Sequence, residues 1–145
     1  MASRLICKNR CGSGFTLPEM LITLLISTLL GCVAYPSYQE QLRKGRRLDA
    51  IQSLTQMQLA QEQYRASHLQ YASAAAQINV RNTSEAGHYD LFITAATATS
   101  FEVAAVARAE SSQQLDTSCA RMSIAVSNGA VQYAGNTPES RCWPW

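Results

Sequence analysis

The residue with the clearest chemical consequence is Glu19, a carboxylate near the start of an apolar segment. Residues 15–38 hold no other Asp, Glu, Lys or Arg. As a helix this segment would span about 36 Å, enough to cross a hydrocarbon core of about 30 Å. A carboxylate within such a span costs at least about 2.5 kcal/mol, so it calls for a cationic partner. The sequence therefore predicts a membrane helix whose one charged side chain has a pairing role.

A short basic segment, residues 1–14, precedes the apolar one and contains no acid. Its charge favours the cytoplasmic side of the membrane. Its small residues come before the span, whereas a secretory signal carries its cleavage site after the apolar region. A cut after Gly14 would give Phe15 a free α-amino group, of ordinary pKa about 7.7–8, one helical turn from Glu19. We therefore expect processing between Gly14 and Phe15, and an ion pair between Glu19 and this amine or that of a neighbouring subunit.

Residues 14–19, GFTLPE, followed by the long apolar run, resemble the class III leader and N-terminal helix of type IV pilins. This resemblance implies cleavage by the prepilin peptidase, N-methylation of Phe15, and assembly through the N-terminal helix. Glu19 would then offset the Phe15 amine of a neighbour and set the stagger between subunits. Residues 35–38, YPSY, are similar to the proline kink of the family, which places a helix kink at Pro36. The compact sheet and the Cys-Trp ending look more like a minor pilin than the bulk subunit.

The same resemblance implies where the protein resides and what it contacts. We expect a single-pass protein of the inner membrane with a periplasmic C-terminal domain, which later enters an extracellular pilus. Its partners would be other pilin subunits, the prepilin peptidase and N-methyltransferase, the inner-membrane assembly machinery and the lipid bilayer. Pilus biogenesis, twitching motility or adhesion would be its role. Three alternatives stay open: a pseudopilin of a type II secretion system, a DNA-receptor pilin for natural transformation, and a membrane anchor that never assembles.

The five cysteines divide by position. Cys7 and Cys11 lie in the expected leader, and Cys32 lies in the apolar segment, where a thiol acts as a small apolar side chain. Cys119 and Cys142 are the pair that remains, and an oxidising compartment predicts a disulfide between them. On the chain-entropy model, closing this loop stabilises the fold by about 3–3.5 kcal/mol.

The rest of the chain predicts an α+β fold. Residues 39–69 continue the helix, with Leu48, Ile51, Leu59 and Leu69 on one arc and Leu54, Met57 and Tyr64 on the next. A sheet is expected against this wide stripe. After a loop from residue 70, β-rich runs occupy 89–94, 101–107, 122–126 and 130–133, and Asn128-Gly129 predicts a hairpin between the last two. The expected divisions are thus 1–14 (leader), 15–38 (span), 39–69 (amphipathic helix) and 70–145 (loop, roughly four-stranded antiparallel sheet and disulfide-bounded end).

Charge and motifs limit the function. Without the leader's three cations, nine Lys/Arg face ten Asp/Glu, a net charge of −1, so no global basic field favours polyanions. The run Arg43-Lys44-Gly45-Arg46-Arg47 is interpreted as a contact with lipid headgroups or a filament neighbour, with DNA as a weaker reading. A DNA receptor would need Arg108, Arg121 and Arg141 to converge on the exported tip. No nucleophile, phosphate-loop or metal-ligand pattern appears, so neither an enzyme nor a cofactor is expected.

Overall fold

The structure is a computed structural model that describes residues 14–137 and 141–144. It divides into two compact units, Met1–Tyr38 and Gln39–Trp145. The predicted leader falls, up to residue 13, outside the described residues.

One helix, α1, runs from Leu17 to Ser67 and contributes to both units. Within it, an 18-residue apolar window has a mean hydropathy of 1.9 and none of it is buried, so α1 is long and apolar enough to cross a membrane. Pro36 lies inside the helix. The helix ends slightly before Leu69, the predicted last residue.

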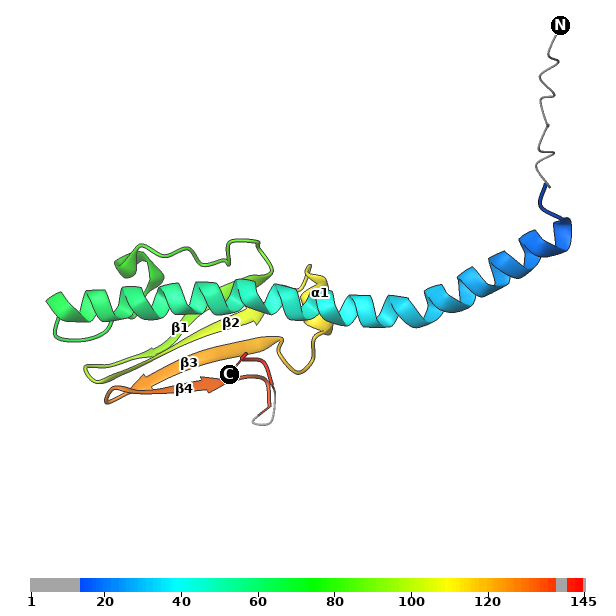
Figure 1. Ribbon diagram of the computed structural model, residues 1–145. Coiled ribbons are helices and arrows are strands. Elements are labelled where there is room, and N and C mark those ends of the chain that lie inside the picture. The colour runs from blue at the N-terminus through cyan, green and yellow to red at the C-terminus, as the bar shows by residue number, and fades with distance from the viewer. Residues whose placement is uncertain (1–13, 138–140, 145) are drawn as a thin grey trace, which may run out of the picture. The chain divides into compact units, whose positions relative to one another are not determined.

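The second unit has the predicted α+β architecture. Its single sheet is antiparallel throughout and has the strand order β1-β2-β3-β4. Two 3₁₀ turns, η1 before the sheet and η2 between β2 and β3, complete the unit. Figure 1 shows the later part of α1 lying along one face of this sheet. The bounds are η1 Ala75–Ile78, β1 Tyr89–Ala96, β2 Ser100–Ala107, η2 Ser112–Leu115, β3 Arg121–Ser127 and β4 Ala130–Ala134.

The β3–β4 hairpin turns where the sequence predicts it. Asn128 has φ 49° and Gly129 has φ 83°. Two consecutive positive φ values are those of a type I′ turn, whose twist matches that of the flanking strands. Ser127 therefore pairs with Ala130, and the register continues to Ser123 opposite Ala134.

The helical face that packs on the sheet differs from the predicted one. Leu54 and Met57 are buried as expected, but Leu48, Leu59 and Leu69 are exposed. The buried arc is completed by small or polar residues: Ala50, Ser53 and Gln61. Small side chains bring the helix close to the sheet. The buried Gln61 amide costs little because it exchanges two hydrogen bonds of 2.8 Å with the backbone of Ala72. The apolar pattern therefore identified two of the five buried residues of α1, Leu54 and Met57.

Two connections fix the segments that flank the sheet, one to α1 and one within the C-terminal region. Asp49 accepts a hydrogen bond from the backbone amide of Ala86 at 3.0 Å and another from the Ser84 hydroxyl, which fixes the loop before β1. The predicted disulfide between Cys119 and Cys142 is confirmed, with a Cα–Cα distance of 5.5 Å. It anchors the C-terminal segment beside the start of β3.

Candidate nucleic-acid interface

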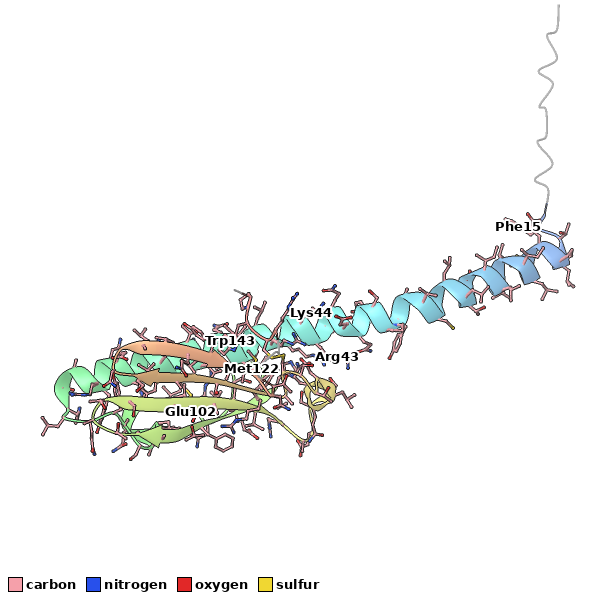
Figure 2. The ribbon with its side chains drawn as sticks, turned by 90° about the horizontal axis from the view of Figure 1, so that it is seen from below. Phe15, Arg43, Lys44, Glu102, Met122 and Trp143 are labelled. Carbon is pink, nitrogen blue, oxygen red and sulfur yellow. A yellow bond between two sulfur atoms is a disulfide. The ribbon has the colours of Figure 1, made fainter. Side chains whose placement is uncertain are left out.

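The basic run on α1 is attached to the η2 turn by its arginines. Arg43 donates from Nη1 to the carbonyl oxygen of Leu115 at 3.4 Å, and Arg46 donates from Nη1 to the Ser112 hydroxyl. Figure 2 shows Arg43 and Lys44 on opposite sides of the helix, at the end of the sheet where α1 joins the second unit. The run is therefore divided between two surfaces.

Arg47, in the same run, is a structural residue whose charge is paired inside the fold. Its Nε and Nη2 donate to the two carboxylate oxygens of Asp116 at 2.6 and 2.9 Å. The two side chains are only 16% and 6% exposed, and the Asp116 hydrogen bond raises the pKa of Arg47 above its usual value. Gln113 also donates to Asp116, at 2.8 Å. The expectation that the whole run faces headgroups or DNA is therefore wrong for Arg47, whose charge is already used inside the fold.

On the η2 side of the helix, a polar pocket of about 390 Å³ combines cations and hydroxyl groups; we call it the Arg46–Arg108 pocket. Arg46 has only the neutral Ser112 hydroxyl as its described hydrogen-bond partner, whereas Arg108 pairs with Asp90 at 3.4 Å. The Nδ1 atom of His88 lies 3.4 Å from the Ser111 hydroxyl oxygen. Guanidinium groups, hydroxyls and imidazole are the donors that contact phosphate oxygens in nucleic-acid complexes. The pocket is lined by Arg46, Ala86, Gly87, His88, Arg108, Glu110, Ser111 and Ser112.

On the other side of α1, a hollow of about 250 Å³ has apolar walls and a basic rim; we call it the Trp143 groove. Lys44 on its rim pairs with Glu40 at 2.7 Å, which lowers the pKa of that carboxyl. The ring of Trp143 lies 4.8 Å from that of Tyr133, and its Nε1 donates to the carbonyl oxygen of Ala134 at 3.1 Å. The lining residues are Lys44, Arg47, Leu48, Ile51, Arg141, Cys142, Trp143 and Pro144.

The three C-terminal arginines do not meet at one point. Arg108 lines the Arg46–Arg108 pocket and Arg141 the Trp143 groove, whereas Arg121 pairs with Glu102 at 3.7 Å across β2 and β3. Arg108 and Arg141 thus lie near residues of the basic run, Arg108 beside Arg46 and Arg141 beside Lys44. No sequence signal indicated the roles of His88, Ser111 and Ser112, because only the fold brings them to Arg46. A partial signal was the i, i+3 spacing of Arg43 and Arg46, which puts both on one side of a helix.

The residues expected to direct processing lie at the start of the described chain. Gly14 and Phe15 precede α1, and Phe15 is exposed. Glu19 occupies the first turn of the helix, and the backbone amide of Thr16 donates to its Oε2 at 3.4 Å. Glu19 therefore lies within one turn of the position where the new amine would stand. Their roles in cleavage, methylation and assembly remain predictions.

Comparison with known proteins agrees with this architecture. The family model described as "Type IV minor pilin ComP, DNA uptake sequence receptor" matches residues 36–123, which is more than half of the chain. No curated protein matches at the threshold used for significance. The matched segment covers the second part of α1, both 3₁₀ turns, β1, β2 and the start of β3. This chain belongs to the ComP family of type IV minor pilins.

Proposed function

We propose that this minor pilin is a DNA receptor of a type IV pilus, which contacts the phosphate backbone through the Arg46–Arg108 pocket. The observation that carries the proposal is the match to a family described as a DNA uptake sequence receptor. The pocket supports it, because within the described residues Arg46 donates to the Ser112 hydroxyl and forms no ion pair, which leaves its charge able to bind a phosphate. DNA binding was the weaker reading of the sequence and becomes the favoured one. A general role in twitching or adhesion and a pseudopilin role have no specific observation in their favour.

The course of the subunit before DNA binding follows from its N-terminal segment. We infer that residues 1–14 are removed, that Phe15 is N-methylated, and that residues 15–38 hold the protein in the inner membrane. The C-terminal unit would then be periplasmic, and the assembly machinery would move the subunit into the extracellular filament. Glu19 would pair with the Phe15 amine of a neighbouring pilin during assembly, with Pro36 kinking the helix near the outer end of the span. The exposed apolar surface of this segment supports its place in a bilayer or filament core.

The experiment is a binding titration of the detergent-solubilised full chain with a short DNA duplex at several salt concentrations. Wild-type protein should bind with an affinity that falls steeply as salt rises. Arg46→Gln should weaken binding to all duplex sequences about equally and reduce the slope of log affinity against log salt by about 1. Arg81→Gln is the matched control, because Arg81 pairs with Glu85 at 3.8 Å, outside the pocket.

Two results would count against the proposal. A full chain that shows no salt-dependent binding even at low salt is not a DNA receptor on its own. If Arg46→Gln and Arg81→Gln bind DNA equally well, the phosphate contacts lie elsewhere on the molecule.

A further inference from the structure

The end of the second unit that adjoins residue 39 combines exposed apolar groups with cations. Leu115, at the end of η2, is 70% exposed, and its carbonyl oxygen is the acceptor for Arg43. Arg46 holds the same turn through Ser112. An exposed leucine in a turn that two arginines contact is the pattern of a surface that lies against lipid headgroups. We call Arg43, Arg46 and Leu115 the junction patch.

The position of the junction patch along the chain matches the depth of the headgroups. Arg43 and Arg46 follow Tyr38, the last residue of the apolar segment, by five and eight positions in the chain. Basic residues this close to the end of a membrane span lie at about the depth of anionic headgroups, which attract them. Trp143, next to Cys142 of the disulfide and in the groove on the other side of α1, is a residue type that favours this depth.

Neither arginine of the junction patch forms an ion pair in the described part of the chain. Arg43 and Arg46 donate to a carbonyl and a hydroxyl oxygen, so both guanidinium groups can still pair with an anion. Arg47, one residue further, is by contrast neutralised by Asp116. A lipid phosphate at the patch would meet the same guanidinium group of Arg46 that lines the Arg46–Arg108 pocket.

We propose that the junction patch rests on anionic phospholipid while the subunit is stored in the membrane, and that this contact occupies Arg46, which binds DNA after assembly. The lipid contact follows from the patch and its position in the sequence just after the apolar segment; the competition with DNA rests on the proposed function. Moving the subunit into a filament removes the lipid and exposes the cations. Lipid thus blocks DNA binding at Arg46 until the subunit is part of a pilus.

The lipid contact is tested by tryptophan quenching in nanodiscs that contain bromine-labelled lipid. The full chain carries Leu115→Trp in a background of Trp143→Phe and Trp145→Phe, so that position 115 holds the only tryptophan. Quenching should be strong in discs of phosphatidylcholine mixed with phosphatidylglycerol and weaker in phosphatidylcholine alone. Arg43→Gln or Arg46→Gln should lower the occupancy of the contact about fivefold, whereas Arg81→Gln should not.

The matched control is Leu69→Trp in the same background. Leu69 is 90% exposed and follows the opposite end of α1, so it should not be quenched. Equal quenching at positions 69 and 115, or none at position 115, overturns the proposal. If the triple substitution prevents folding, as shown by circular dichroism, quenching of native tryptophan in the Trp145→Phe chain is the second measurement. Quenching of Trp143 that depends on phosphatidylglycerol and on Arg43 supports the contact, and its absence overturns it.

The competition is tested by adding the duplex to the mixed-lipid discs. DNA that displaces lipid should relieve the quenching at position 115, and bound DNA that leaves quenching unchanged overturns the competition. Inorganic phosphate at the same phosphate concentration should have little effect, because it lacks the multivalence of a surface. If the detergent-solubilised chain binds no duplex while lipid-dependent quenching persists, the DNA function fails and the lipid contact stands.

Discussion

Arg47 and Asp116 form a two-pronged ion pair that joins the basic run of α1 to the loop between β2 and β3, with N–O distances of 2.6 and 2.9 Å. The same guanidinium donates from Nη1 to the carbonyl oxygen of Arg141 at 3.3 Å. One side chain therefore ties together the helix, the η2 region and the C-terminal segment. Arg47 is adjacent in the sequence to Arg46, which lines a surface pocket, yet Arg47 itself supports the fold.

Removing either partner of this pair should destabilise the second unit strongly. Arg47→Gln or Asp116→Asn leaves a nearly buried charge without its counterion, which typically costs about 3–5 kcal/mol. Urea unfolding of both variants and of the double variant measures the coupling between the two residues. Arg46→Gln, which removes a neighbouring cation without a carboxylate partner, should change the free energy of unfolding by much less. Additive effects of the two substitutions would show that the pair is not coupled.

Loss of the disulfide should also lower stability. Cys119→Ser with Cys142→Ser frees a loop whose closure is worth about 3–3.5 kcal/mol on the chain-entropy model. The measurement is the denaturation midpoint of this double variant against oxidised wild type. Reduced wild type should match the variant closely. If both unfold at the midpoint of the oxidised protein, the C-terminal segment is held by its other contacts.

Stability should fall at high pH because of Tyr89. Burial raises the pKa of this phenol to about 12, and its hydroxyl lies 3.4 Å from the carbonyl oxygen of Cys119 as a donor. The unfolded chain releases the proton near pH 10, so the stabilisation is complete below pH 10 and is lost as the pH rises toward 12. Between these values one such group contributes a slope of about 1.4 kcal/mol per pH unit. Unfolding followed from pH 8 to 12 measures this slope.

Tyr89→Phe is the control for this pH dependence. The phenyl ring keeps the packing and removes the titrating hydroxyl, so the decline above pH 10 should become shallower. Tyr71, whose pKa is also raised by partial burial, stays in both proteins and contributes equally. An identical decline in wild type and variant would assign the effect to other groups.

Processing at the N-terminus is tested by the intact mass of protein extracted from membranes. We expect loss of residues 1–14, a gain of one methyl group at Phe15, and a further change of two hydrogens on reduction of the disulfide. Gly14→Val should block the cut and retain the leader. An uncleaved wild-type chain, in cells with active prepilin peptidase, would make the protein a plain membrane anchor.

The main elements of the fold were predictable because each has a local sequence signal. The apolar segment, the Asn128-Gly129 turn and the alternating strands depend on neighbouring residues, and all appear near their predicted bounds. The buried face of α1 was not predictable by the same means. Leu48 and Leu59 are exposed while Gln61 is buried, because the partner of Gln61 is the backbone of Ala72, in a different segment.

The candidate site, too, could be predicted only in part from the sequence. The positions of the arginines and lysines can be read directly, but whether each one can bind an anion depends on partners far along the chain. Arg46 and Arg47 are adjacent, yet one meets the Ser112 hydroxyl and the other a buried carboxylate. Only the structure separates the arginine that can bind an anion from the one that supports the fold.

The Cys119–Cys142 bond brackets β3 and β4, since both strands lie between its two cysteines in the chain. A chain is made and delivered from its N-terminus, so Cys119 must wait as a free thiol until the last hairpin has followed it. The disulfide can therefore form only after β3 and β4 have both been synthesised, so a subunit that contains it also contains the whole sheet. A chain stopped before Cys142 would keep Cys119 as an unpaired thiol in addition to Cys32, which is free in the complete chain as well.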